Sequence, residues 1–315
     1  MPRTTDHLRL PSPHPPTSVP TRAIDPAARE RPSATSDECL VCGGRSYEPS
    51  HSGLRWCMAC GFVSAARMPS DAEVHRLYDE QYFRGGEYED YVRDRRCAQR
   101  NFGSRLRVLR SFLQPTRHRH LFEVGSAYGF FLDLARREFE TVRGIDVTGA
   151  GTRYARDTLG LDVLTDDFLQ YDFGGARFDV VCLWDTIEHL RSPGRHVQKI
   201  ADHTESGALL AVTTGDIGSL NARMRRGSWR LIHPPTHLHY FSRATLARLL
   251  RRHGFDVVYS RACGFWRSAR GAAYALLVLR QRRPEVFARL ERAGLVDFDF
   301  YLNLFDIMFV IARRQ

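Results

Sequence analysis

Short apolar segments alternate with amphipathic ones over most of the 315-residue chain. From residue 120 onward, five apolar runs have the length of β-strands. They cover residues 120–124, 141–147, 162–165, 178–184 and 208–214. Helical spacing separates them at residues 129–138, 149–159 and 193–203. This alternation predicts an α/β fold with a doubly wound, mostly parallel sheet and helices on both of its faces.

The pattern continues to the end of the chain with a helix at 243–254, a strand at 255–261, a helical insert and a last strand at 307–314. Before the sheet, residues 71–83 and 92–113 are expected to form helices. Nine arginines lie between residues 93 and 119. A solvated helix face explains them more simply than an RNA-binding surface, although both interpretations fit the pattern.

Composition changes the picture most at the N-terminus, where residues 1–36 hold eight of the fifteen prolines and are expected to be a disordered tail. We expect a cysteine module at 37–66, a helical cap at 67–118 and a ligand-binding domain at 119–315. No apolar run reaches the length of a membrane span, and residues 1–16 lack the apolar segment of a signal peptide. A cytoplasmic location without disulfides is therefore expected. The net charge of +10 is compatible with phosphate-bearing partners.

Four cysteines are spaced as two C-x-x-C pairs, Cys39 with Cys42 and Cys57 with Cys60. Four thiolates complete the tetrahedral shell of a structural zinc site, and a glycine after each pair, Gly43 or Gly61, allows a tight turn. Iron in the same site and a pair of redox dithiols are the alternatives. We expect the loss of one cysteine to loosen residues 39–61 and to leave the remaining chain folded.

A glycine-containing loop follows the strand at 120–124 and opens a helix, as nucleotide-binding loops do. Its candidate ligand-binding residues are Glu123, Gly125, Ala127 and Gly129. The third glycine of a dinucleotide fingerprint is missing, and an acidic residue precedes the loop. This arrangement suits a ligand with an ammonium and a sulfonium group better than one with two phosphates. Asp146 ends the next strand, and an acidic and aromatic pair, Asp167 and Phe168, follows the third.

These segments, together with 178–190 (FDVVCLWDTIEHL) and 234–242 (PPTHLHYFS), resemble class I S-adenosylmethionine-dependent methyltransferases. The resemblance is to the group with an N-terminal zinc ribbon near the sugar C-methyltransferases. It implies a Rossmann-like domain in which the glycine loop holds the methionine moiety of the cofactor. It further implies that Asp146 binds the ribose and that Asp167 and Phe168 hold the adenine. Trp184 ends the strand at 178–184 and is expected at the same site.

The stretch at 233–242 (HPPTHLHYFS) holds three histidines, which suit a metal site, acid/base chemistry or a rigid structural loop. A second metal is the weakest of these, since four cysteines already provide for zinc. By the resemblance, His237 is the catalytic base. Glu188 and His189 are also candidate catalytic residues, expected at the carboxyl end of the strand at 178–184, where they either orient the loop or touch the substrate. In extended backbone His237 and His239 would point the same way.

Four further residues are expected to line the substrate or to form a lid over it. These are Tyr88, Tyr91, His239 and Tyr240.

The sequence thus predicts a methyltransferase that uses S-adenosylmethionine and carries zinc. The expected acceptor is a small molecule, such as a nucleotide-linked sugar or a natural-product intermediate. One alternative is an RNA methyltransferase that grips RNA with its zinc ribbon and arginines. Another is a non-catalytic zinc-ribbon scaffold, against which the intact acidic positions argue. No membrane partner is expected.

Overall fold

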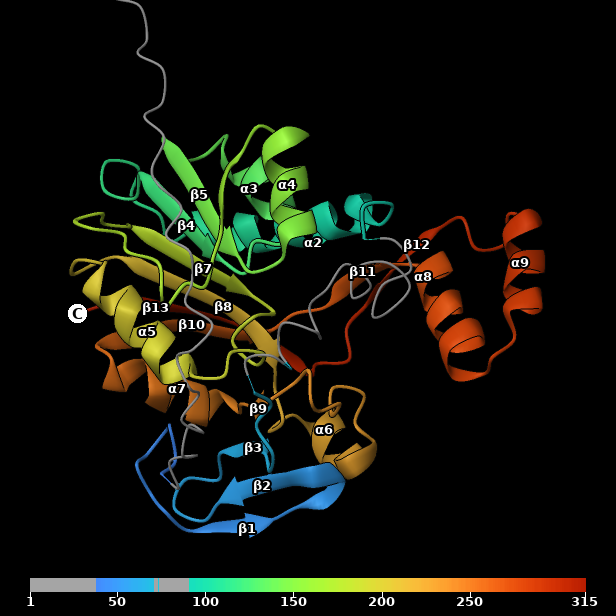
Figure 1. Cartoon of the computed structure of the whole chain (residues 1–315), viewed down its shortest axis with the longest axis horizontal. Helices are drawn as coiled ribbons and strands as arrows, with labels where there is room; N and C mark the ends of the chain where they lie inside the picture. The colour runs from blue at the N-terminus through green and yellow to red at the C-terminus, as the bar shows by residue number, and fades with distance from the viewer. Residues whose placement is uncertain (1–37, 71–72, 74–90) are drawn as a thin grey trace, which may run out of the picture. The chain divides into compact units, whose positions relative to one another are not determined.

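Seven strands of the described residues form one mixed sheet in the order β10-β13-β8-β7-β4-β5-β6 (Figure 1). The structure is a computed structural model that describes residues 38–70, 73 and 91–315. Its parallel strands are β4 (His120–Val124), β5 (Thr141–Asp146), β6 (Asp162–Thr165), β7 (Val180–Trp184) and β8 (Leu209–Gly215). β13 (Ile307–Arg314) runs antiparallel between β8 and β10 (Phe255–Ala262). The predicted doubly wound α/β fold is confirmed.

Neighbouring residues of each strand serve opposite faces of the sheet. Phe122 and Val181 pack into the core on one face, whereas Leu121 and Val180 pack into the core on the other. Both faces are apolar because helices cover both, which is why the strands read as continuous apolar runs rather than as alternating ones.

Each face has its own set of helices (Figure 1). One face is covered by α5 (Pro193–Asp202) and α7 (Arg243–Arg252). The other is covered by α2 (Arg95–Arg110), α3 (Phe130–Ala135) and α4 (Gly149–Asp157). All five fall inside segments with predicted helical spacing.

The cysteine module is built on three short antiparallel strands, β1 (Tyr47–Pro49), β2 (Leu54–Cys57) and β3 (Val63–Ala65), with the 3-10 turn η1 (His51–Gly53) between the first two. β9 (His239–Tyr240) joins them by pairing with β3. Phe62 of the module packs in the same core as Phe241 and the sheet. The sheet of the cysteine module is therefore completed by a segment about 175 residues later in the chain.

The predicted helical insert between β10 and β13 contains a two-stranded sheet that the sequence did not reveal. β11 (Phe265–Ser268) pairs with β12 (Asp299–Leu302). Between them lie α8 (Ala269–Ala273), the π-helical segment η4 (Tyr274–Arg280) and α9 (Pro284–Arg292). The insert is fastened to α2 by Asn101, whose side chain bonds both the amide and the carbonyl of Trp266.

Seven of the nine arginines between residues 93 and 119 form ion pairs with acidic residues. These are Arg93, Arg95, Arg96, Arg100, Arg105, Arg110 and Arg119. Their partners come from other elements, such as Asp299 of β12 and Asp133 of α3. The basic run thus joins elements of the fold to one another.

Several sequence-based expectations fall outside the described residues. The disordered tail at 1–36 and most of the helix expected at 71–83 are among them. Within the described ranges, none of the helices combines the length and the apolar character needed to cross a bilayer.

Asp306, just before β13, anchors the segment that follows β8. Its carboxylate is 1% exposed and accepts hydrogen bonds of 2.8 Å from Asn221, Trp229 and Arg230. Its main-chain carbonyl accepts the amide of Asp216. These bonds hold α6 (Leu220–Arg225), the 3-10 turn η3 (Arg226–Ser228) and the chain that leads to residue 233.

We expect Asp306→Ala to lower the free energy of unfolding by about 2–4 kcal/mol, because it strands a buried indole N–H and a half-buried guanidinium. Denaturant titration measures this change. The matched control is Asp256→Ala, since Asp256 makes an exposed ion pair with Arg251 and its loss should cost under about 1 kcal/mol. Equal stability of the two variants would contradict the anchoring role of Asp306.

Candidate active site

The glycine loop leaves the carboxyl end of β4 in a conformation that requires glycine. Gly125 and Gly129 have φ angles of 78° and 72°. A Cβ atom on Gly125 would lie 2.6 Å from the Thr186 hydroxyl oxygen, so the backbone must come close to the loop that follows β7. Ala127 also has a positive φ, 45°, which costs an alanine about 1–2 kcal/mol. The loop is thus held in a shape that its sequence only partly favours.

Asp146, at the end of β5, holds the glycine loop. Its carboxylate accepts hydrogen bonds from the amides of Ala127 and Thr148, each at 2.8 Å, and from the Thr148 hydroxyl. Burial raises the pKa of this carboxyl, and these three donors lower it. A carboxylate has about four acceptor positions, so Asp146 retains capacity for a ligand hydroxyl.

Three buried polar atoms near the glycine loop make no hydrogen bond within the described residues. They are Oε2 of Glu123, Oγ of Ser126 and Nε1 of Trp184. Burial raises the pKa of Glu123 well above its usual range. An ammonium group nearby would favour the charged form of this carboxyl. The donor set therefore fits the methionine end of the expected cofactor.

The two residues of the predicted adenine pair have different surroundings in the structure. Asp167 is exposed, and its carboxylate accepts the amide of Leu169. Phe168 is 4% exposed, and its ring packs against Phe122, Phe173 and His196. Core side chains thus cover the Phe168 ring, and the expectation that Asp167 and Phe168 hold the adenine stays a prediction.

Val147 is an apolar side chain that sequence reasoning missed. It follows Asp146 directly and is 43% exposed, beside the predicted ribose-binding position. Nothing in the sequence indicates that this valine is exposed, and only its position next to Asp146 draws attention to it. Unlike the Phe168 ring, the Val147 side chain is accessible.

Glu188, His189 and His237 meet at one point, with one metal-ligating atom of each within 4.8 Å of the others. Glu188 and His189 lie in the loop after β7, and His237 lies before β9. The main-chain carbonyl of Glu188 accepts the amides of Leu238 and His239, at 2.9 and 3.1 Å. These two hydrogen bonds hold the two segments together.

The histidine rings have fixed tautomers, because a carbonyl oxygen can only accept. Nδ1 of His189 donates to the carbonyl of Thr236 at 2.9 Å, and Nδ1 of His237 donates to the carbonyl of Leu231 at 2.9 Å. In each neutral ring, Nε2 therefore carries the lone pair. The His233 ring packs on His237, with ring centroids 3.8 Å apart.

Burial controls the charge of this cluster. It raises the pKa of Glu188 to about 8, with a contribution from the charge of Asp185, and it lowers the pKa of His189 to about 4. Burial and the neighbouring His189 and His233 lower the pKa of His237 to about 2. Both imidazoles are neutral at physiological pH, and a base with so low a pKa takes up a proton poorly.

The expected substrate-lining residues have different surroundings. His239 and Tyr240 are 1% and 3% exposed. The His239 ring stacks on Phe62 of the cysteine module, and the Tyr240 hydroxyl donates to the carbonyl of His237. Both side chains are thus covered, and their expected substrate-lining role stays a prediction. His237 and His239 also contact different groups, since regular strand begins only at His239.

The predicted lid includes two tyrosines, Tyr88 and Tyr91. Tyr91 stacks on Phe130 and packs against Tyr128, next to the glycine loop. Tyr88 lies outside the described residues.

Arg105 is a second residue that sequence reasoning missed. It comes from α2 and is 5% exposed, yet it donates to the carboxylate of Asp185 at 2.8 Å. The Thr213 hydroxyl donates to the other oxygen of Asp185. Arg105 is one of nine arginines in its segment, and only the tertiary structure separates it from those on the surface.

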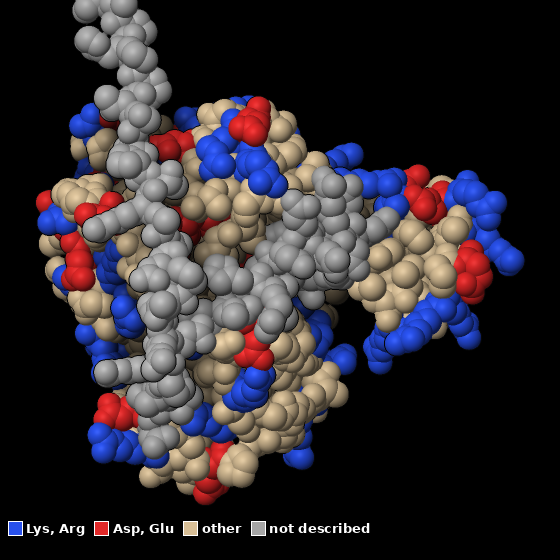
Figure 2. Space-filling view, in the orientation of Figure 1, with Lys and Arg blue, Asp and Glu red and all other residues tan. Residues whose placement is uncertain are grey.

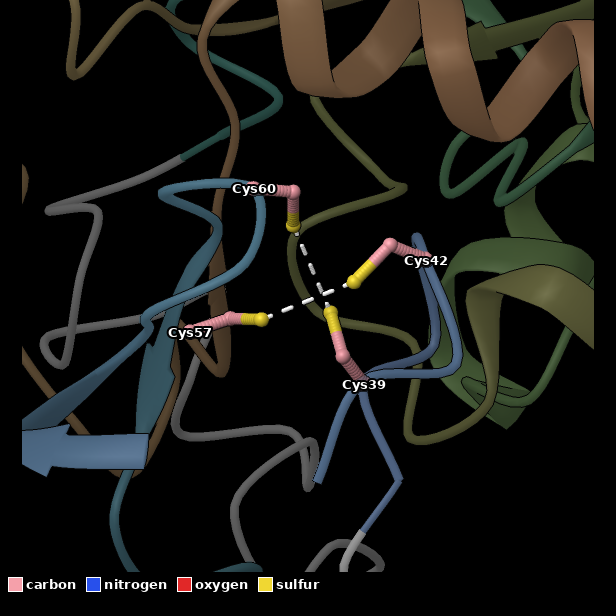
Figure 3. A group of neighbouring side chains, drawn as sticks. All are labelled: Cys39, Cys42, Cys57 and Cys60. Atoms are coloured by element: carbon pink, nitrogen blue, oxygen red, sulfur yellow. Dashed lines mark hydrogen bonds between the residues drawn. The ribbon is translucent and has the colours of Figure 1, made fainter. Parts of the chain in front are cut away.

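The four cysteines converge as predicted (Figure 3). Sulfur–sulfur distances are 3.6 Å for Cys39 and Cys60 and 3.5 Å for Cys42 and Cys57. A tetrahedral zinc site with Zn–S bonds of about 2.3 Å has edges of about 3.8 Å. Gly43 and Gly61 have positive φ angles, which confirms their place in the two turns.

The thiols also fit a cation electrostatically. Burial raises the pKa of Cys39 and of Cys60, so these two thiols are not thiolates by themselves. Although burial opposes it, the amide of Gly44 and the neighbouring thiols lower the pKa of Cys42 to about 7. A bound cation would supply the charge that keeps all four deprotonated.

A model of the methyltransferase domain family matches residues 91–260. Magnesium protoporphyrin IX methyltransferase (ChlM) from Synechocystis PCC 6803, with bound SAH, has a TM-score of 0.51 at 13% identity, over 78% of this chain and 100% of that one. A protein from Galdieria sulphuraria, provisionally named a sarcosine dimethylglycine methyltransferase, has a TM-score of 0.49 at 16% identity, over 76% and 98%. None of the curated proteins matches the sequence.

The match covers more than half of the chain and includes the glycine loop, Asp146 and Glu188. The likeness to the Synechocystis enzyme shows the same fold. The chain therefore belongs to the methyltransferase domain family, and its α/β domain is a class I S-adenosylmethionine-dependent methyltransferase domain.

Proposed function

We propose that the protein transfers the methyl group of S-adenosylmethionine to a small metabolite, such as a nucleotide-linked sugar or a natural-product intermediate. In this reaction the bond between sulfur and the methyl carbon breaks as the acceptor forms a bond to that carbon. The acceptor loses a proton, and the cofactor leaves as its thioether. The protein supplies alignment, exclusion of water and activation of the acceptor.

One contact carries this proposal. Thr186, two residues before Glu188, lies against Gly125, so the loop that bears Glu188 and His189 packs directly on the glycine loop. The Glu188–His189–His237 cluster is thereby next to the expected cofactor site, at the carboxyl ends of the parallel strands, where ligands of this fold bind.

The distribution of basic side chains favours a small-molecule acceptor over RNA. Most arginines of the basic segment are engaged in ion pairs within the chain, such as Arg100 with Asp299. On the face that Figure 2 shows, Lys and Arg side chains are spread around the described surface with Asp and Glu among them. An RNA-binding surface would gather unpaired basic groups in one stripe.

We further propose that the four cysteines hold a structural zinc ion. The site supplies four thiolates, so no coordination position is left for water or substrate, which is the pattern of closed structural sites. The Cβ atom of any residue at position 44 would lie 3.2 Å from the Cys42 sulfur, so the chain is wrapped tightly around the site.

Asp146→Ala should weaken S-adenosylmethionine binding by about 1–3 kcal/mol, because it removes an acceptor for the ribose and the support of the Ala127 amide. Calorimetry measures the affinity. Asp162→Ala is the control: it breaks an ion pair with Arg143 at the amino end of β6, away from Asp146, and should leave the affinity unchanged. A wild-type protein that ignores this cofactor and binds a nicotinamide dinucleotide tightly would refute the cofactor assignment.

Cys42→Ser should remove one equivalent of zinc per chain and lower the thermal midpoint. Because β3 pairs with β9, hydrogen exchange should increase at residues 239–240 as well as at 39–61. Elemental analysis and exchange mass spectrometry give the two readouts, with Cys263→Ser as the matched control. Folded wild-type protein without metal and without disulfides would exclude the site.

Labelled methyl groups from the cofactor should enter a pool of nucleotide sugars or small metabolites and not a pool of RNA. His237→Ala should retain cofactor binding and lower the single-turnover rate by about 10²–10⁴-fold, the range for loss of an acceptor-activating group.

His239→Ala is the control for this test, because its ring lies against the cysteine module; it should reduce stability and change the rate far less. Transfer into RNA alone, with a steep dependence on salt, would favour the RNA methyltransferase instead. Transfer into none of the pools by a protein that binds the cofactor would favour a non-catalytic scaffold.

A further inference from the structure

The Glu188–His189–His237 cluster has the donor set of a metal site and lies apart from the four cysteines. One carboxylate oxygen and one nitrogen from each ring lie within 4.8 Å of one another. Two imidazoles and one carboxylate leave coordination positions open, as in catalytic zinc and non-haem iron sites.

The hydrogen bonds of both rings are those of metal ligands. Histidines that bind metals usually donate the other ring N–H to a carbonyl or carboxylate, which fixes the ring and presents the remaining nitrogen. His189 does so toward the Thr236 carbonyl and His237 toward the Leu231 carbonyl. Thr236 also accepts a hydrogen bond from Nδ1 of His233, whose ring supports His237.

The carboxylate supplies a second and independent observation. Glu188 is 4% exposed, and its Oε2 atom makes no hydrogen bond within the described residues. Such an atom is costly to bury unless a ligand satisfies it. The Glu188 backbone is fixed by two amides, so this side chain is held at the cluster.

We propose that Glu188, His189 and His237 bind a divalent transition-metal cation such as Mn²⁺, Fe²⁺, Co²⁺ or Zn²⁺. Imidazole and carboxylate donors suit these cations, whereas Cu(I) prefers soft sulfur ligands. The inference rests on the proposed function, which it extends: the cation would bind a hydroxyl or enolate oxygen of the acceptor and lower its pKa.

Titration with Mn²⁺ of full-length protein that carries a single equivalent of zinc, in the cysteine site, tests the proposal without an activity assay. The paramagnetic signal of free Mn²⁺ reports binding. One saturable equivalent per chain is expected. Glu188→Gln and His237→Ala should weaken it by at least about 100-fold, more than the loss of a residue that only orients a ligand. Zinc in the cysteine site should be unchanged, and circular dichroism reports whether each variant is folded.

His203→Ala is the matched control, because Nδ1 of His203 also bonds a main-chain carbonyl but lies outside the cluster. It should keep the Mn²⁺ site. Wild-type protein with no saturable site for Mn²⁺ or for Co²⁺ would overturn the inference, as would equal Mn²⁺ binding by wild type, Glu188→Gln and His237→Ala. Methyl transfer that persists without the cation would also overturn it and leave the proposed function intact. Cation binding without methyl transfer would refute the proposed function alone.

Discussion

The main-chain carbonyl of Glu188 accepts two consecutive amides, those of Leu238 and His239, and the arrangement of the site depends on this junction. It joins the loop after β7 to a segment about fifty residues later. On one side of the junction lies the Glu188–His189–His237 cluster, and on the other β9 extends the sheet of the cysteine module. Without it, neither the cluster nor the fourth strand of that sheet would be assembled.

Buried polar groups hold the two ends of this junction in place. Asp185 is bound by Arg105 from α2 and by Thr213 from β8. Asp306 gathers Trp229 and Arg230 from the approach to residue 233. Arg105 and Asp306 are buried, and buried charges of this kind are costly unless every partner is in position, so they favour one arrangement over its close alternatives. The site is therefore supported by charge pairing as well as by the apolar core.

This architecture couples the cysteine module to the methyltransferase domain. Phe62 packs on Phe241 and His239, and the module shares a core with the sheet. A metal in the four-cysteine site would therefore stabilise β3 and, through it, β9. The effect would reach His237, because Tyr240 donates its hydroxyl to the carbonyl of that residue.

The sequence alone determined the strands and helices of the seven-stranded sheet from residue 120, the convergence of the four cysteines and the tight turns at Gly43 and Gly61. These depend on periodicity, on close spacing and on backbone sterics, all of which are local. The tertiary structure decided which side chains are covered. Phe168 and Tyr240 have the residue types of ligand contacts, yet core packing and strand pairing enclose them. It also selected Arg105 from its neighbours and brought His237 to Glu188, because contacts between distant segments leave no periodic signal in the chain.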